Sequence, residues 1–314
     1  MRRVTGTICF ATESGLGIEA RAFITHGVVD KILIAPHARY ANYPEWYTQE
    51  QRCPDEDALL RDCERLMFFE SAFGREALLR KARERGVKLV LMTHYEFTGP
   101  VLDGQFDALV APSDEDLRHY SNAVRINVPA DAAWRQRTRA LTFVHNAGHG
   151  GVKGRNGTQE LLDAMVYVKS PIKLIVRVQP SAHVSVQSND PRVELRLGTA
   201  PSEELFDEGD VFVMPDKFGG SFLPMQEAFA SGMLVMASDR ENNRWLPNEF
   251  LIPVDRYVDD FIRLAFKSAV VTPRAIAAKI DEIYGQDITS VSLAGRTWAE
   301  VNSWDALRGA YEAL

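Results

Sequence analysis

The sequence predicts an α/β protein with two domains, each built on a largely parallel sheet. Short apolar runs of β type alternate with helical patterns along most of the 314 residues, which is typical of βαβ units. The alternation breaks once, around 129–140, and then starts again. The length also corresponds to about two compact domains.

The first series of elements begins with a strand near 4–11, a helix near 16–27 and a strand at 31–35. A long helical stretch is expected from about 55 to 85. Runs rich in Val, Leu and Ile then predict the remaining strands, because a strand covered on both faces is apolar throughout. These strands are at 87–92, 108–111 and 124–128.

The second series begins after the break, and its final part has helical patterns only. Its predicted strands are at 141–145, 173–178, 193–197, 211–214 and 234–237, its predicted helices are near 157–168, 202–207, 224–231 and 257–270, and helices alone are expected from about 274 to 314. We therefore divide the chain into domains at 1–137 and 138–290, followed by a helical segment at 291–314.

The composition excludes several classes of protein. Hydrophobic residues make up 46% of the chain and charged residues 25%, which excludes a disordered or collagen-like chain. The 43 acidic and 36 basic residues are interspersed, so no strongly basic surface is expected. Three cysteines without a CxxC pair indicate neither a disulfide framework nor a zinc site. No signal peptide or membrane-spanning run is evident, so we expect a cytoplasmic protein without a transmembrane segment.

Functional residues are expected in the strand-to-helix loops, because ligands of α/β sheets bind at the carboxyl ends of the strands. The first such loop contains Gly15 and Gly17 just before a helix. Two glycines allow backbone N–H groups to approach an anion. The spacing is not GxGxxG, and an ordinary tight turn explains the loop equally well.

The second loop, 145–157, is more unusual. Five glycines lie between Gly148 and Gly157, with two cations among them, directly before a helix. Flexible backbone donors and fixed cations suit a pyrophosphate better than a structural turn. The candidate binding residues are Gly150, Gly151, Lys153, Arg155 and Asn156. His145 and His149 are as readily explained as structural hydrogen-bonding groups.

The third loop joins the strand at 211–214 to the helix at 224–231. Glu227 lies among Ala228, Phe229 and Ala230, and a carboxylate on an apolar helix needs hydrogen-bond donors such as ribose hydroxyls. A capping or solvent-facing glutamate is the alternative. The other candidates are Asp216, Gly219, Gly220, Ser221, Phe222 and Leu223.

These loops together resemble the donor-binding domain of GT-B glycosyltransferases, especially the retaining family 4. The resemblance is carried by the second loop before Leu161-Leu162, by the segment 210–239, and more weakly by Ser14-Gly15-Leu16-Gly17 and Arg296-Thr297-Trp298. It implies two Rossmann-like domains facing across a cleft. The first would bind the acceptor and the second the nucleotide-sugar, and the final helix would cross back to the first domain.

The resemblance also assigns roles to the candidate residues. It implies that Glu227 binds ribose hydroxyls, that 219–223 lies against the donor sugar, and that basic residues of the second loop hold the diphosphate. Two departures stand out. Gly219 occupies a position where the family usually has glutamate, with Asp216 nearby, and Gly151 and Asn156 occupy the positions of an Arg and a Lys. Lys153 and Arg155 would then act from shifted positions.

The resulting hypothesis is a glycosyltransferase that moves a sugar from a UDP- or GDP-sugar to an acceptor hydroxyl. Fixed cations and backbone amides can neutralise the leaving diphosphate without a metal or other cofactor. His94 and Glu96 follow a central strand of the first domain and are the candidate catalytic residues, as a base or as groups that orient the acceptor. The resemblance implies a retaining outcome, for which an ordinary base is not required.

Two alternatives stay open. Compact virus-type GT-B enzymes glycosylate hydroxymethylated bases in DNA, so the acceptor would be modified DNA instead of a saccharide or a lipid-linked saccharide. Alternatively, the glycine at position 219 fits a non-catalytic module that only binds sugar nucleotides. The feature that favours DNA is a set of basic residues on or near one predicted helix, Arg75, Arg80, Lys81, Arg83, Arg85 and Lys88.

Overall fold

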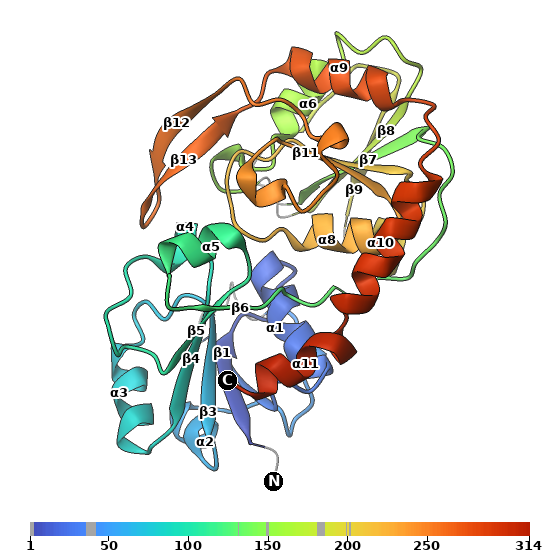
Figure 1. Cartoon of the computed structure of the whole chain (residues 1–314). Coiled ribbons are helices and arrows are strands. Elements are labelled where there is room, and N and C mark those ends of the chain that lie inside the picture. Colours follow the sequence, from blue (N-terminus) through green and yellow to red (C-terminus); the bar gives the residue numbers. More distant parts are fainter. Residues whose placement is uncertain are drawn as a thin grey trace. The chain divides into compact units, whose positions relative to one another are not determined.

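A computed structural model describes residues 3–35, 42–130, 132–148, 151–180, 186–198, 200 and 202–314. Most contacts between residues lie within one or the other of two groups, so the chain divides into two compact α/β units (Figure 1). The first unit comprises Met1–Val128, Phe261–Leu264 and Trp304–Leu314, and the second comprises Pro129–Asp260 and Ala265–Ser303. Each unit has its own sheet and its own apolar core.

The first unit is built on a six-stranded sheet in the order β2-β1-β3-β4-β5-β6, with every neighbouring pair parallel. The central strands are buried along nearly their whole length, which is why they read as continuous apolar runs. The strands are β1 (Thr5–Cys9), β2 (Lys31–Ile34), β3 (Arg65–Glu70), β4 (Lys88–Thr93), β5 (Ala108–Ala111) and β6 (Val124–Arg125).

Helices from both ends of the sequence pack together in this unit. The ring of Phe23 makes edge contacts with Trp304 and Tyr311, both at 4.9 Å between centroids. Figure 1 shows the resulting neighbours, α1 in blue and α11 in red. The helices are α1 (Gly15–Thr25), α2 (Glu56–Leu60), α3 (Glu76–Glu84), α4 (Tyr95–Thr98), α5 (Asp114–His119) and α11 (Trp304–Glu312), with a 3-10 turn at Pro44–Trp46.

The predicted helical stretch from 55 to 85 is wrong in its middle. Only α2 and α3 are helical, and β3 runs between them as a central strand of the sheet. Because β3 is buried on both faces, it lacks the alternation that identifies a half-exposed strand, and its apolar run blends into the two helical patterns. The error concealed Glu70 at the carboxyl end of β3.

The second unit has a five-stranded parallel sheet in the order β11-β10-β7-β8-β9. The five predicted strands are all present, and a cluster of buried apolar side chains surrounds them. They are β7 (Thr142–Gly148), β8 (Lys173–Val178), β9 (Val193–Leu197), β10 (Val211–Met214) and β11 (Leu234–Ala237).

Close packing of two helices in this unit depends on one glycine. A Cβ atom at Gly295 of α10 would lie 2.1 Å from the carbonyl oxygen of Phe229 on α8, so only glycine allows the approach seen in Figure 1. The helices are α6 (Thr158–Ala164), α7 (Ser202–Leu205), α8 (Leu223–Ala230), α9 (Pro273–Ile283) and α10 (Thr289–Val301), with 3-10 turns at Val152–Gly154, Glu241–Asn243 and Asn248–Phe250. The helical nature of 274–314 is confirmed.

The predicted helix at 257–270 is also wrong. This segment forms the two-stranded sheet of β12 (Arg256–Phe261) and β13 (Ala265–Val270). In β13, Ala265 and Lys267 are exposed while Phe266 and Ser268 are buried, which is the period of two expected for a strand. The other predicted elements are present with shifted ends: β6 has only two residues, and α6 ends at Ala164.

Candidate functional site

The loop after β1 holds α1 in place through a serine cap and one required glycine. The Ser14 hydroxyl accepts a hydrogen bond from the Gly17 N–H group at 3.2 Å, which satisfies an otherwise open donor of the first turn. A Cβ atom at Gly17 would lie 2.1 Å from the carbonyl oxygen of Thr12, so no larger residue fits. Gly15 is exposed and has open space around it, so it is the glycine of this loop that a ligand can approach.

His94 follows β4, at the same carboxyl edge of the sheet, and faces a glutamate of α1. Its Nε2 atom lies 3.5 Å from Oε2 of Glu19, and both side chains are largely buried. The backbone around His94 is fixed, because its N–H group donates to the Thr98 hydroxyl at 2.8 Å and that hydroxyl donates to the carbonyl oxygen of Glu70 at 2.6 Å. His94 was predicted as a site residue from the sequence, whereas Glu19 was not.

Several more carboxylates lie around His94. Asp116 of α5 is fully buried and accepts from the Tyr95 N–H group at 2.7 Å and from the Ser113 hydroxyl. Glu96, the second candidate catalytic residue, is 2% exposed. Glu70 adds negative charge from the end of β3.

This environment changes two pKa values. Burial by itself lowers the pKa of His94, but the carboxylate of Glu19, together with those of Asp116 and Glu70, raises it to about 10. Burial raises the pKa of Asp116 to about 6, although the charge of His94 opposes the change. At neutral pH His94 is therefore a cation, which argues against its use as a base.

Glu70 also has an unusual backbone conformation, with a φ of +65°. Residues other than glycine rarely occupy this region, and such strain is concentrated at functional sites. The sequence offered no signal for this conformation. A correct prediction of β3 would have placed Glu70 at the carboxyl end of a central strand and made it a candidate site residue.

The second loop is a series of left-handed turns packed on the segment after β10. Gly151, Lys153, Gly154 and Gly157 all have φ between +53° and +69°. A Cβ atom at Gly157 would lie 2.1 Å from the carbonyl oxygen of Pro215. The glycines thus allow the two loops to touch. Gly150 and His149 lie outside the described residues.

Three cations gather where these two loops meet. Lys153 pairs with Asp260 of β12, and the guanidinium group of Arg155 lies 5.1 Å from the ring centroid of Phe222. Lys217 comes from the second of the two loops, and its backbone N–H group donates to the carbonyl oxygen of Arg155 at 2.8 Å. Its ammonium group lies against the first loop, 3.7 Å from the position of a Cβ atom at Gly154. Lys217 was not among the residues predicted from the sequence, because nothing in a single sequence brings it next to 153–155.

Asn156 supports the same loop from within. Its side-chain amide donates to the carbonyl oxygen of Ala147 at 3.1 Å, and a Cβ atom at Gly151 would lie 2.9 Å from its Oδ1 atom. In this structure Asn156 therefore shapes the loop around the cations.

Asp216 is completely buried and organises the glycine turn that follows it. Its carboxylate pairs with Arg240 and accepts from the Asn243 amide at 2.8 Å. Arg240 also donates to the carbonyl oxygen of Gly219 at 2.9 Å, and Asn242 donates to the carbonyl oxygens of Gly219 and Gly220. Side chains of the segment that follows β11 therefore hold the glycine turn in place.

The end of this turn presents a polar atom without a partner. The Ser221 hydroxyl is buried and makes no hydrogen bond, which is costly unless a ligand or water completes it. Phe222 is buried beside it, Leu223 begins α8, and Glu227 lies on the same helix in a half-buried position. The structure therefore places Ser221 to Glu227 in one continuous turn and helix.

His145 has a structural role. Its ring bridges the carbonyl oxygen of Val213 and the hydroxyl of Thr158 at 2.7 and 2.8 Å. Burial lowers its pKa to about 4, against the weaker effect of the bond to Val213, so the ring is neutral at pH 7. It ties β7, β10 and α6 together.

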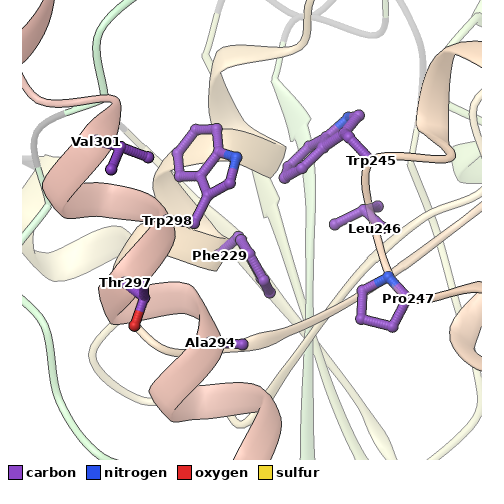
Figure 2. Close-up of a pocket in the computed structure, with 8 residues that line it drawn as sticks. All are labelled: Phe229, Trp245, Leu246, Pro247, Ala294, Thr297, Trp298 and Val301. Atoms are coloured by element: carbon purple, nitrogen blue, oxygen red, sulfur yellow. The ribbon is translucent and has the colours of Figure 1, made fainter.

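An apolar pocket of about 660 Å³ lies elsewhere in the second unit (Figure 2). Trp245 and Trp298 line it and stack on each other, with ring centroids 5.2 Å apart, and Phe229 lines it next to them. None of its lining residues is a sequence-predicted site residue, and its apolar walls do not suit a charged ligand.

The part of the chain that the structure describes lacks two further kinds of feature. Within it, no group of three or more His, Cys, Asp or Glu side chains is arranged to hold a metal ion. No helix there has both the length and the apolarity that crossing a bilayer requires.

Comparison with solved structures identifies the fold. Sucrose-phosphate synthase from Thermosynechococcus elongatus matches over 98% of this chain and 97% of its own chain, with a TM-score of 0.61 and 12% identity. The pneumococcal O-GlcNAc transferase GtfA, solved with UDP and GlcNAc, matches over 79% of this chain with a TM-score of 0.55 and 12% identity. TarM, an S. aureus protein, matches over 78% with a TM-score of 0.56 and 12% identity.

These likenesses establish a GT-B fold with two Rossmann-like domains. This chain spans only 56% of GtfA and 54% of TarM, whereas it spans nearly all of the sucrose-phosphate synthase. No protein-family model matches the sequence, and no curated protein sequence matches it.

Proposed function

We propose that this protein transfers a sugar from a nucleotide diphosphate sugar to a hydroxyl group of an acceptor. The observation that carries the proposal is the meeting of two loops in the second unit, where the cations Lys153, Arg155 and Lys217 lie beside a glycine turn. A diphosphate needs several positive charges, and a sugar needs close approach to backbone, which glycines permit. The GT-B fold adds support, because GtfA was solved with UDP.

The donor would lie along these two loops. The three cations would bind the diphosphate, and Glu227 would accept hydrogen bonds from the ribose. The sugar would lie against 219–223, where the Ser221 hydroxyl lacks a partner. UDP is the first nucleotide to test, since both GtfA and TarM were solved with it.

Leaving-group stabilisation in this proposal is metal-independent. Lys153 and Lys217 are placed by ion pairs with Asp260 and Glu160 before the donor binds. The diphosphate would replace these carboxylates, and the positive charges would then lie beside it as negative charge develops in the reaction. Retention of the anomeric configuration is also part of the proposal. It is supported by the state of His94, because a cationic imidazole is unsuited to be the base that an inverting reaction requires.

The acceptor side is proposed to be the carboxyl edge of the first sheet, around His94 and Glu96. A saccharide hydroxyl is the favoured acceptor class, free or lipid-linked. Glycosylation of DNA is not favoured, because cations that would form a basic face have partners inside the unit. Lys81 and Arg85 pair with Asp57 at 3.0 and 2.5 Å, and Arg83 donates to backbone carbonyl groups.

The test is a panel of UDP-, GDP- and ADP-sugars with mono- and disaccharide acceptors, followed by release of the nucleoside diphosphate and by mass spectrometry of the product. We expect one donor to be consumed and a glycoside to appear, with and without a chelator. Tight binding of a donor without hydrolysis or transfer would instead identify a non-catalytic binding module. Activity that disappears with a chelator would contradict metal independence.

A further inference from the structure

The buried pair of His94 and Glu19 has a geometry that constrains how His94 can act. Nε2 of His94 has no access to solvent and lies 3.5 Å from Oε2 of Glu19. The ring can therefore meet a ligand only along its Nδ1 edge. The side chain as a whole keeps 14% of its surface accessible, and Nε2, unlike Nδ1, is among the buried atoms without a hydrogen bond.

The burial of Glu19 calls for a positive charge nearby. The residue is 3% exposed, and its Oε1 atom makes no hydrogen bond. Burying a carboxylate in this way costs free energy unless a positive charge compensates it. His94 is the group that can supply this charge, because it is the side chain with which the carboxylate pairs.

The other groups around the ring favour the same charge state. Glu19 faces it from α1, Asp116 from α5 and Glu70 from the end of β3. Glu96 of α4 acts on Asp116, and the Cys9 thiol beside Glu19 stays protonated because burial raises its pKa. The groups that raise the pKa of His94 most are all carboxylates. A single ring surrounded by carboxylates is most stable as a cation.

We propose that Glu19 is a positioning residue for His94. Its carboxylate holds the Nε2 edge of the ring inside the unit and keeps the ring positively charged, so His94 meets the substrate through Nδ1 as a hydrogen-bond donor. In the proposed glycosyl transfer, to which this role belongs, His94 would bind a sugar hydroxyl or a developing negative charge. It would not remove a proton from the acceptor.

The first test does not depend on activity. The protonation of the His94 ring is followed by NMR in wild type and in E19Q, with the resonance assigned by its loss in H94Q. We expect the wild-type ring to titrate near pH 10, and the midpoint to fall by roughly 1–3 units in E19Q. Glu50 is exposed, so E50Q is the matched control and leaves the midpoint unchanged.

The second test uses the reaction itself. At high pH, kcat/KM should fall as His94 loses its proton, and this fall should occur at lower pH in E19Q than in wild type. E19D keeps the negative charge on a shorter side chain. Compared with E19Q, its His94 midpoint should therefore return closer to the wild-type value than its kcat does. Thermal unfolding shows which variants are folded. If E19Q does not fold, E19D is used in its place in both tests.

Three outcomes decide the matter. A wild-type midpoint near 6.5, or an E19Q midpoint equal to that of wild type, would overturn the role of Glu19. A shifted midpoint with an unchanged pH profile of kcat/KM would overturn its link to the reaction. If no donor is consumed by the wild type, the proposed function fails, while the NMR titration still decides the pairing of Glu19 with His94.

Discussion

The ammonium group of Lys217 lies 2.7 Å from Oε1 of Glu160. Lys217 comes from the loop between β10 and α8, whereas Glu160 lies in the first turn of α6. The ammonium group also lies next to the glycine-rich loop, since its Nζ would be 3.7 Å from a Cβ atom at Gly154. The second oxygen of Glu160 is buried without a hydrogen bond. Lys217 is therefore fixed beside the glycine-rich loop by a carboxylate that a diphosphate could replace.

Substitution of Lys217 by methionine should weaken binding of UDP. A hydrogen bond to a charged group contributes about 1.5–3 kcal/mol, so the Kd measured by calorimetry should rise roughly ten- to a hundredfold. Uridine lacks the phosphates and should bind equally to both proteins. K173M is the control, because Lys173 is exposed and pairs with Glu194 on the sheet. An unchanged Kd for UDP would remove Lys217 from the site.

Substitution of Glu227 by alanine tests the ribose contact. Binding of UDP should fall by about tenfold or more, because two hydroxyl groups lose a charged acceptor. The loss should be much smaller for 2′,3′-dideoxyuridine diphosphate, which lacks both hydroxyls. E249A, at an exposed glutamate of the same unit, should bind both ligands like wild type. Equal losses for the two ligands would show that Glu227 acts elsewhere.

Substitution of Gly157 by alanine should destabilise the protein by at least about 2 kcal/mol. The new Cβ would collide with the Pro215 carbonyl oxygen, and φ is +69°. In G285A the φ of +77° is equally unfavourable but the space is open, so a loss of only about 1 kcal/mol is expected. Urea unfolding measures both, and equal losses would mean that the loop moves away without cost.

Removal of the Arg240 side chain leaves the buried carboxylate of Asp216 without its ion-pair partner. We expect R240M to lose about 3–5 kcal/mol of unfolding free energy. In contrast, R244M breaks an exposed pair with Asp239 and should cost less than about 1 kcal/mol. A stable R240M protein that still binds UDP normally would show that the glycine turn holds its shape without this network.

The raised pKa of His94 predicts a pH dependence of stability. In the folded protein the ring keeps its proton up to about pH 10, whereas an unfolded chain loses it near 6.5. The folded state therefore binds more protons in this window, and its stabilisation by His94 is complete below about pH 6.5 and lost as the pH rises toward 10.

Urea unfolding between pH 7 and pH 10 measures this dependence. Wild type should lose stability over this range more steeply than H94Q, in which the titrating group is absent. A variant such as H119Q, which removes the ring stacked on Tyr95, should keep the wild-type slope. Parallel slopes for wild type and H94Q would contradict the pKa assigned to His94.

Local sequence patterns were sufficient for most of the α/β architecture. Apolar runs marked ten of the eleven strands of the two large sheets, because each run is a property of neighbouring residues. They gave the wrong prediction at β3, a strand buried on both faces whose apolar run lies between two helical patterns. They were also wrong at β12 and β13, which were predicted as one helix. In both places the tertiary environment, not local periodicity, decides between helix and strand.

The candidate loops were also identified from the sequence, because glycines and cations before a helix are a local signal. What the sequence determined by itself was the alternating α/β order, the positions of these loops and the residues His94 and Glu227 as candidates. The tertiary structure alone decided that Glu19 faces His94 and that Lys217 joins Arg155. These partners are far apart in the chain and meet only when parallel strands bring their carboxyl ends to one edge, so their charges and pKa values are set by the fold.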